Sequence, residues 1–267
     1  MSSWRNESGR PLASDAWLQA HHKAKLKERQ AFAQRILETN PRRIVDLGCG
    51  TGLWLDLLAA NAPIECELIG LDTDEAALEI ARMRAQKWQQ PHRFNRLDFE
   101  AQVDELPRAD AFLAFNVFPY VAHPQALLDQ LKEKVNAGGC VVVRQYDGAM
   151  LRMGPMNEED RTLIDTSLKT SMLGSQQFKH FDLDRVFASI AASTFAVKTF
   201  DFEVFNRTTP YSADFLNYLS NTIEWTRQYL SDDAKNRLDW WLNERKIVSE
   251  SPCPSYFVEV DMVAWLS

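Results

Sequence analysis

Short apolar runs alternate with amphipathic stretches between residues 40 and 147. The apolar runs are residues 44–47, 68–71, 93–97, 111–117 and 140–143. The stretches with helical spacing are about residues 53–61, 75–88 and 125–135, with a weaker one at 100–106. Apolar strands joined by helices are typical of right-handed β-α-β units, whose parallel sheet is buried on both faces. This half of the chain is therefore predicted to form an α/β core.

The flanking segments predict further helices and two late strands. Residues 15–39 have apolar residues at helical spacing, and Asn40 with Pro41 ends that helix. Beyond Asp147, the pattern predicts helices at about 158–175 and 183–192, a strand at 195–205, a helical block at 212–245 and a last strand at 256–265. Two late strands separated by helices would add an antiparallel edge to the sheet.

The late helical block is rich in aromatic residues. Its large rings are Tyr218, Trp225, Tyr229, Trp240 and Trp241. Aromatic side chains at helical spacing usually pack in a core, because these rings have much apolar surface to bury. Helices inserted beside an α/β sheet also form lids, so this block is a candidate cover for a ligand site.

Composition excludes several classes of protein. The chain has 267 residues, of which 45% are hydrophobic and 25% charged, as in ordinary globular enzymes. No apolar run approaches the roughly 20 residues of a membrane helix, and residues 1–11 lack the apolar centre of a signal peptide. The 4 cysteines show no metal-binding or disulfide spacing. We therefore expect a cytoplasmic protein with reduced thiols and no metal site.

Charge is unevenly distributed along the chain. The formal net charge is −7, which disfavours binding to long nucleic-acid backbones. Residues 1–43, however, hold nine basic and four acidic residues. This basic segment is a candidate grip on a phosphate or carboxylate, although charge runs on helices more often only face water.

A glycine-rich turn follows the first predicted strand. Three glycines, Gly48, Gly50 and Gly52, alternate with other residues just before a helix, so the backbone and the free N–H groups of the helix can approach a ligand. The G-x-G-x-x-G spacing of dinucleotide sites is absent, because position 53 is Leu. Asp46, two residues ahead of the first glycine, would repel a diphosphate and attract an ammonium group.

Acidic residues also end the second and third predicted strands. Asp72 lies where an acidic side chain binds both hydroxyls of a ribose, with Thr73 beside it. Asp98 offers an acceptor for an exocyclic amine, and Phe99 offers a ring for a purine. The alternatives are an N-cap role for Asp72, which Thr73 or another neighbour could fill, and a surface-turn role for Asp98. Ammonium, ribose and adenine together describe S-adenosylmethionine.

These segments resemble the class I S-adenosylmethionine-dependent methyltransferases. Asp46-Leu-Gly48-Cys49-Gly50-Thr-Gly52 is similar to their first motif, Asp72 to their ribose acid and Asp98 to their adenine-side acid. Residues 134–139 are similar to the turn ahead of their fifth strand. The resemblance covers about residues 42–146, and beyond them the order of elements resembles the ubiquinone-biosynthesis and trans-aconitate type of small-molecule methyltransferase. Relatives often have Asp-Pro after the fourth strand, where this chain has His123-Pro124.

The resemblance implies a fold and a domain plan. It implies a Rossmann-like, mostly parallel sheet of seven strands with an antiparallel last strand and helices on both faces. Residues 1–267 would form a single methyltransferase domain, with an N-terminal helical lid at 1–41, a cofactor-binding core at 42–147 and substrate-side helices with the last two strands at 148–267. S-adenosylmethionine is the expected cofactor and S-adenosylhomocysteine the product.

Several residues become site candidates through this resemblance. The cofactor-binding candidates are Asp46, Gly48, Cys49, Gly50, Asp72, Thr73, Asp98, Phe99 and Asn116. The catalytic candidates are His123 and Tyr120, which follow the fourth strand. The alternatives are that His123 caps the next helix and that Tyr120 packs in the core. The segment from Asn116 to Tyr120 also departs from the Asn-Pro-Pro-Tyr motif of DNA-base methyltransferases, which argues against DNA as the substrate.

The substrate candidates lie on the fifth strand and the first helix. They are Arg144, Tyr146, Trp17 and His21. Arg144 is suited to bind a carboxylate with two N–H groups, or it pairs internally with Asp147 or Glu203. The first helix also carries His22, and adjacent helical residues point about 100° apart, so at most one of the two histidines faces a ligand.

Methyl transfer from a sulfonium needs alignment and desolvation rather than a nucleophilic side chain. The predicted function is transfer of a methyl group to O or N of a small-molecule acceptor, by a monomer or homodimer with no membrane span. The alternatives are an RNA- or protein-directed methyltransferase that uses the basic N-terminal helix, and a non-catalytic cofactor-binding module. A Rossmann domain that binds NAD is a further alternative.

Overall fold

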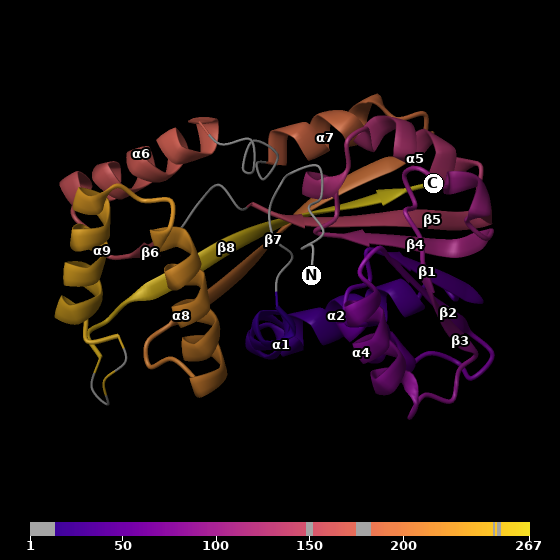
Figure 1. The fold of residues 1–267 in the computed structure, drawn as a ribbon, viewed down its shortest axis with the longest axis horizontal. Helices are drawn as coiled ribbons and strands as arrows, with labels where there is room; N and C mark the ends of the chain where they lie inside the picture. The colour runs from indigo at the N-terminus through magenta and orange to yellow at the C-terminus, as the bar shows by residue number, and fades with distance from the viewer. Residues whose placement is uncertain (1–13, 148–151, 175–182, 248, 250–251) are drawn as a thin grey trace.

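The computed structural model describes residues 14–147, 152–174, 183–247, 249 and 252–267, which form an eight-stranded sheet with helices on both faces (Figure 1). The strands are β1 (Arg43–Leu47), β2 (Glu67–Asp72), β3 (His92–Arg96), β4 (Ala109–Phe115), β5 (Val135–Tyr146), β6 (Arg152–Gly154), β7 (Lys198–Thr208) and β8 (Tyr256–Leu266). Their order is β3-β2-β1-β4-β5-β8-β6, and β7 pairs with β8. The predicted strands and their mostly parallel arrangement are confirmed.

β8 is antiparallel to all its neighbours. Val141 to Tyr146 of β5 pair with its second half, β6 pairs with its first half, and β7 runs along the whole of it. Because β5 and β6 take successive parts of one edge of β8, β7 must occupy the opposite edge. β8 is therefore the one strand of the described sheet that runs against the others, as predicted for the last strand.

The helices fall into three groups (Figure 1). They are α1 (Asp15–Ala24), α2 (Leu26–Leu37), α3 (Leu53–Ala59), α4 (Glu75–Ala85), α5 (Pro124–Lys132), α6 (Glu158–Gly174), α7 (Leu183–Ala192), α8 (Ala213–Arg227) and α9 (Asp232–Glu244). In the view of Figure 1, α1, α2 and α4 lie below the sheet and α5 with α7 above it. α6, α8 and α9 gather around the start of β8.

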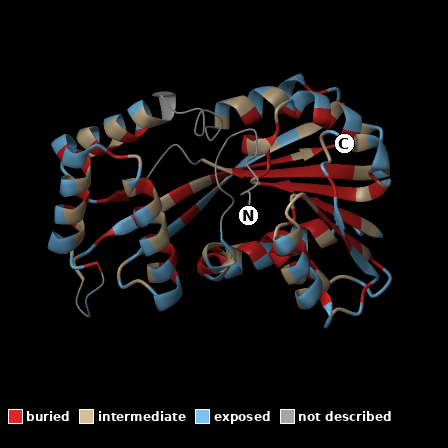
Figure 2. Ribbon diagram, in the orientation of Figure 1, coloured by how far each residue is buried: buried red, intermediate tan, exposed pale blue. Residues whose placement is uncertain are grey.

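The central strands are buried on both faces, as Figure 2 shows. Because successive side chains of a strand point to opposite faces, alternate residues enter different cores. Val45 and Phe112 pack in the cluster with α5 and α7, whereas Ile44 and Leu113 pack in the cluster with α2 and α4. A third cluster joins α8 and α9 to the first half of β8. Among the described residues, none lies in a helix long and apolar enough to cross a membrane.

The fold differs from the sequence-based expectation in four places. The first helix is two helices that meet at Lys25, whose ammonium group is buried against Glu259. An eighth strand, β6, is present, and its three residues are too few to show a pattern. The glycine turn expected before the fifth strand lies inside β5. There, the four residues 136–139 form a bulge between Val135 and Cys140, which pair with Ala109 and Ala111. The weak helix at 100–106 is a 3₁₀ turn at Val103–Glu105.

Candidate active site

The glycine-rich turn is held against the end of β2. The backbone N–H groups of Gly48 and Cys49 both donate to the carbonyl oxygen of Leu71, at 2.8 and 3.0 Å. Gly48, Gly50 and Gly52 have φ of 68°, 52° and 75°, the left-handed region that favours glycine. The alternating glycines therefore let the chain fold back across two strand ends before α3 begins.

Asp72 connects this turn to the helix that follows β2. Its Oδ2 accepts a hydrogen bond from the Gly50 N–H at 2.8 Å, and its Oδ1 accepts one from the Asp74 N–H at 2.9 Å. The N-cap of α4 is Asp74, whose carboxylate accepts from the Ala76 N–H at 3.0 Å. Burial raises the pKa of Asp72, although these backbone donors oppose the rise. Asp74, rather than Asp72, is therefore the N-cap of α4. Thr73, which lies between them, is half-buried.

Asp46 is the most unusual polar group at the strand ends. Its side chain is 2% exposed, and its Oδ2 is buried without a hydrogen-bond partner. Burial, together with the nearby Asp72 carboxylate, raises the pKa of Asp46 well above its usual range. A buried carboxylate oxygen without a donor is costly, and a bound donor or cation would remove that cost.

Cys49 is buried beneath the turn. Burial, with a further contribution from Asp46 and Asp72, raises the pKa of its thiol well above the ordinary value. The thiol therefore stays protonated. The Cys49 backbone N–H, rather than the thiol, shapes the turn.

At the end of β3, Asp98 is exposed and Phe99 half-buried. The Asp98 Oδ1 accepts from the N–H groups of Glu100 and Ala101, both at 3.1 Å. Asp98 therefore does hold a surface turn, the alternative its position had left open. The Phe99 ring packs on the core cluster that contains α5.

The ends of β4 and β5 are joined by Asn116. Its Oδ1 accepts from the Tyr146 N–H at 3.0 Å, and its own N–H donates to the Arg144 carbonyl oxygen at 2.8 Å. Asn116 has φ of 57°, a left-handed conformation that asparagine tolerates better than most residues. Its amide oxygen is therefore engaged with β5, and its backbone turns the chain after β4.

Helix α1 covers the glycine turn. A Cβ placed on Gly50 would lie 3.8 Å from Cδ1 of Leu18. Ser14 caps the helix, and Trp17 and His21 lie one turn apart on it with ring centroids 5.5 Å apart. The first helix thus carries Leu18, which lies over the turn, as well as the two substrate candidates, whose rings both contact Tyr218.

A small cavity lies between α1, α8 and the strand ends. It measures about 30 Å³ and is lined by Trp17, Tyr146, Asp147, Leu168, Tyr218, Thr222, Trp225, Thr226, Phe257 and Glu259. A cavity of this size holds one or two water-sized groups. The structure therefore brings two of the substrate candidates, Trp17 and Tyr146, into one wall with rings from the aromatic-rich block.

Glu259 is the most deeply buried charge of this wall. Tyr218 Oη donates to its Oε2, and Lys25 Nζ contacts its Oε1. All three residues are no more than 7% exposed. Burial and the adjacent Glu259 carboxylate raise the pKa of Tyr218 well above its usual range. Tyr218 therefore remains a neutral hydroxyl that donates to a carboxylate.

Arg144 pairs internally. It donates to Glu203 Oε2 and Asp261 Oδ2, each at 2.5 Å, and its guanidinium lies 4.7 Å from the centre of the Phe32 ring. The carboxylates of Asp261 and Glu203 outweigh burial and raise the pKa of Arg144. Arg144 thus pairs internally with Glu203, as one alternative expected, and with Asp261, which was not expected; its use as a substrate ligand stays a prediction.

His21 is buried and neutral. Its ring stacks on Tyr218 with centroids 4.9 Å apart, and its Nε2 has no hydrogen-bond partner. Burial, and then the positive charges of Lys25, Arg29 and Arg144, lowers its pKa well below the usual range. His21 thus backs the aromatic cavity rather than lining it, and of the two adjacent histidines it is the one that points inward.

The two catalytic candidates are separated by the structure. Tyr120 is half-buried and packs on the same cluster as Tyr146 and Tyr218. His123 is exposed and is the N-cap residue of α5, as the alternative expected: its carbonyl oxygen accepts from the Leu127 N–H at 3.0 Å, although its side chain makes no capping hydrogen bond. It lines a different, open cavity of about 380 Å³ between α5 and α7. The structure thus does not bring His123 together with Tyr120, Trp17 and Tyr146.

The sequence reasoning missed two charged residues of the site, Glu259 and Lys25. The sequence signal for Glu259 was weak. Glu259 and Asp261 alternate with apolar residues on β8, but they lie on the face of the strand that is buried against α1 and α2. Acidic side chains at inward positions of a strand require buried partners. Within the part of the chain that the structure describes, no group of three or more His, Cys, Asp or Glu side chains is arranged to hold a metal ion.

Known proteins match the first half of this chain. A family model described as "Methyltransferase domain" matches residues 45–141. Trans-aconitate 2-methyltransferase of Methylobacterium nodulans is 36% identical over 113 residues, which are 42% of this chain and 42% of that protein. Ubiquinone biosynthesis O-methyltransferase of Alkalilimnicola ehrlichii is 30% identical over 102 residues, 38% of this chain and 40% of that protein. The alignments thus span about two-fifths of these relatives.

A solved structure shares the fold over most of the chain. A protein of Bacillus halodurans C-125, described as a candidate methyltransferase, aligns with a TM-score of 0.54 and 15% identity, covering 89% of this chain and 97% of that one. At this identity the likeness concerns the fold alone.

Proposed function

We propose that this chain is a class I S-adenosylmethionine-dependent methyltransferase that transfers a methyl group to an oxygen or nitrogen atom of a small-molecule acceptor, which the match of residues 45–141 to a methyltransferase-domain family supports. The observation that carries the proposal is the arrangement of residues at the carboxyl ends of β1 and β2. There, the turn at Gly48 and Gly50 meets two carboxylates, Asp46 and Asp72.

The residues present fit the cofactor. The unpartnered, buried Oδ2 of Asp46 suits an ammonium group, which would supply the missing donor. Asp72 lies at the end of β2, where acidic side chains bind ribose hydroxyls. Asp98 and Phe99, at the end of β3, are proposed for the adenine, because Asp98 is exposed and it is Oδ1 that accepts the hydrogen bonds of its turn. We assign the remaining cofactor contacts to Gly48, Cys49, Gly50, Thr73 and Asn116.

S-adenosylmethionine, when bound, would supply the methyl group to the acceptor lone pair and leave as S-adenosylhomocysteine, while the acceptor proton would pass to solvent. The protein has to align the two molecules and exclude water. Leu18 of α1 covers the turn at Gly50, and Trp17 and Tyr146 close the acceptor side. Tyr120, which packs on the same cluster as Tyr146 and Tyr218, is the candidate to relay that proton to solvent.

We propose that the chain acts as one domain. α1 and α2 would serve as the N-terminal cover, residues 42–147 as the cofactor-binding core and the later helices as the acceptor side. Contacts of α1 with both the glycine turn and α8 support this plan. The free thiols of Cys49, Cys66, Cys140 and Cys253 support action in the reducing cytoplasm.

A macromolecular acceptor is less well supported. The basic leading segment is used largely inside the molecule: Lys25 and Arg29 are buried, and Arg35 pairs with Glu203 at 2.7 Å. Arg5 and Arg10 lie outside the described residues. If RNA were the acceptor, binding to tRNA would weaken steeply with salt, because displaced counterions drive such binding.

Calorimetric titration with S-adenosylmethionine, S-adenosylhomocysteine and NAD tests the proposal. We expect micromolar binding of the first two, no binding of NAD, and loss of binding in Asp72→Ala. Binding of NAD alone, or of none of the three, would contradict it. Release of S-adenosylhomocysteine in the presence of acceptors then separates an enzyme from a non-catalytic cofactor-binding module.

A further inference from the structure

The segment between β4 and α5 contacts the glycine turn at its first residue. Residues 117–123, termed the acceptor loop, include Tyr120, the candidate proton relay. A Cβ placed on Gly48 would lie 2.7 Å from Cγ2 of Val117. Apart from one 3₁₀ turn, the loop lies outside helices and strands, so its remaining backbone groups need partners from other segments.

Glu100 supplies two of these partners from the turn after β3. Its Oε2 accepts from the Ala122 N–H at 3.0 Å, and its Oε1 accepts from the His123 N–H at 2.6 Å. The backbone N–H of Glu100 donates to Oδ1 of Asp98 at 3.1 Å. One residue therefore connects the turn proposed to bind the adenine with the loop that carries Tyr120.

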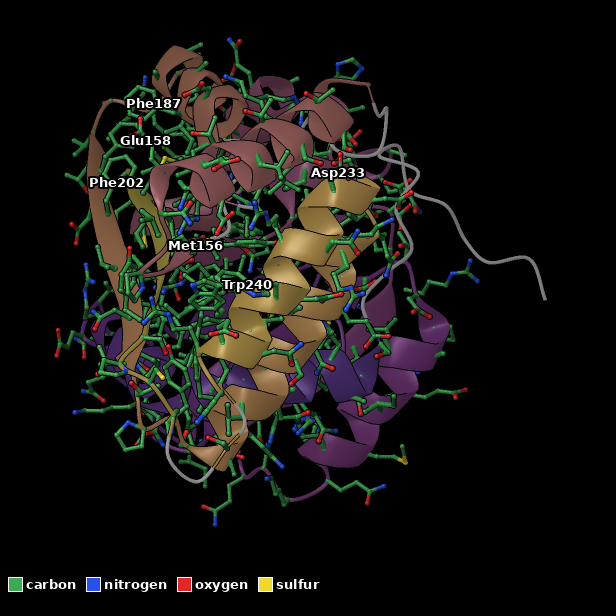
Figure 3. The ribbon with its side chains drawn as sticks, turned by 90° about the vertical axis from the view of Figure 1, so that its left-hand side faces the viewer. Met156, Glu158, Phe187, Phe202, Asp233 and Trp240 are labelled. Atoms are coloured by element: carbon green, nitrogen blue, oxygen red, sulfur yellow. The ribbon has the colours of Figure 1, made fainter. Side chains whose placement is uncertain are left out.

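A guanidinium from α7 holds the same loop by other contacts. Arg185 donates to three carbonyl oxygens of the acceptor loop, at 2.7 to 3.0 Å. They belong to Phe118, Val121 and Ala122. α7 packs on β7 through Phe187, whose ring centroid lies 4.6 Å from that of Phe200 (Figure 3). Arg185 therefore anchors the loop to α7, whereas Glu100 anchors it to the adenine turn.

We propose that Glu100 is a positioning residue for methyl transfer, which orders the acceptor loop, and with it Tyr120, when adenine occupies the turn after β3. The inference rests on the proposed methyltransferase function and adds a link between its cofactor and acceptor sides. Glu100 itself touches neither the reacting atoms nor the adenine in this role.

The physical reason for the link is the cost of ordering Glu100. A carboxylate holds backbone N–H groups more strongly than a neutral acceptor does. It loses rotamer freedom when it does so, and less is lost when the backbone that carries it is already held. Adenine bound at Asp98 and Phe99 would hold the two residues directly before Glu100. Filling the adenine end and ordering the acceptor loop therefore favour each other, and this coupling is reciprocal.

The hydrogen bonds to Glu100 lie where their opening can be measured. Ala122 is half-buried, and His123 is exposed and lines the open cavity between α5 and α7. Water therefore reaches both N–H groups when the contact with Glu100 opens, and their hydrogen exchange reports on that opening. Because water can also replace the carboxylate, substitutions of Glu100 should leave the protein folded.

Amide hydrogen exchange, resolved to Tyr120, Ala122 and His123, tests the inference. Saturation of the wild type with S-adenosylhomocysteine is expected to slow these amides about threefold or more. 5′-Methylthioadenosine, which keeps the adenosine but lacks the amino-acid end, should slow them equally. Neither compound should slow them in Glu100→Ala, and Glu100→Gln, which keeps one acceptor oxygen, should give an intermediate effect.

Two control variants separate the coupling from general loosening of the loop. Arg185→Met should speed exchange of the loop but retain the slowing by S-adenosylhomocysteine, because the contact with Glu100 remains. Glu158→Gln makes the same chemical change at an exposed residue of α6 and should behave as the wild type (Figure 3). Equal slowing in Glu100→Ala and the wild type, or loss of the slowing in Arg185→Met, would overturn the role of Glu100.

The outcome separates the two proposals. If S-adenosylhomocysteine binds to the wild type without slowing these amides, the methyltransferase proposal stands and Glu100 is not a positioning residue. If S-adenosylhomocysteine does not bind to the wild type, the methyltransferase proposal fails, and the role of Glu100 fails with it.

Discussion

The Asp72 carboxylate accepts a hydrogen bond from the backbone N–H of Gly50, with 2.8 Å between Oδ2 and nitrogen. The other oxygen of the same carboxylate accepts from the N–H of Asp74 at 2.9 Å. One side chain thus fixes the distance between the glycine turn after β1 and the start of α4. Asp72, which is proposed to bind ribose, therefore also stabilises the conformation of the glycine turn.

Asp72→Asn is expected to weaken S-adenosylhomocysteine binding at least tenfold. The amide keeps one acceptor oxygen for the backbone but loses the charge and the second acceptor that a ribose diol requires. Calorimetry measures the change. The control is Asp74→Asn, because asparagine caps a helix about as well as aspartate, and α4 should be retained. Equal affinities of the two variants would argue against ribose binding by Asp72.

Gly50→Ala is expected to reduce cofactor affinity beyond its effect on stability. At φ of 52°, an alanine costs about 1–2 kcal/mol of folding free energy, and its methyl group enters the proposed crevice beneath Leu18. Gly138→Ala is matched to it: φ is 78° and no atom lies within 4 Å of the added Cβ. Both variants should lower Tm similarly, but only the first should weaken binding. Weakened binding in both would show a general effect of strain.

Asp46→Asn is expected to stabilise the free protein at pH 7 and to weaken cofactor binding at least tenfold. Burial and Asp72 raise the pKa of Asp46, so the stability linked to its protonated form is full below the unfolded-state pKa and lost as the pH rises through the folded-state value. Above the unfolded-state pKa, the buried Asp46 therefore lowers the stability of the fold.

Thermal unfolding across a range of pH checks this expectation. A gain of about 1 kcal/mol corresponds to a rise in Tm of about 2–4 °C for a domain of this size, and it should vanish toward pH 4. S-adenosylhomocysteine binding to the wild type should also fall as Asp46 becomes protonated. A lower Tm at pH 7 together with unchanged binding would contradict both halves of the prediction.

Arg144→Met is expected to lower the free energy of unfolding by about 3–5 kcal/mol at pH 7, because Asp261 would be left buried without its guanidinium partner. Burial raises the pKa of Asp261, but Lys25 and Arg144 outweigh it and the net shift is downward. The stability from this carboxylate is therefore present above the unfolded-state pKa and lost as the pH falls through the folded-state value.

Urea unfolding between pH 7 and pH 3 measures the Arg144 effect. The penalty should shrink at the acid end, and adding Asp261→Asn should restore part of the stability. KM for an acceptor should change little, since Arg144 does not line the cavity. A large rise in KM with unchanged stability would return Arg144 to the role of substrate ligand.

The core and the cofactor side could be predicted from the sequence because their signals are local. Strands buried on both faces show continuous apolar runs, and the turn between Asp46 and Gly52 lies within a few residues of chain. The helix break at Lys25 and the three residues of β6 could not be predicted this way, since a buried contact with Glu259 accompanies the first and pairing with β8 defines the second.

The acceptor side was decided by tertiary structure alone. Trp17 and Glu259 are 242 positions apart, and their meeting in one cavity depends on where α1 packs against α8 and on which face of β8 turns inward. From the sequence, Arg144 could bind either a substrate or an internal carboxylate. In the folded chain it pairs with Glu203 and Asp261. Residue types and local spacing thus determined the cofactor chemistry, whereas long-range packing determined which charges are neutralised and which line the cavity, because burial is a property of the folded chain.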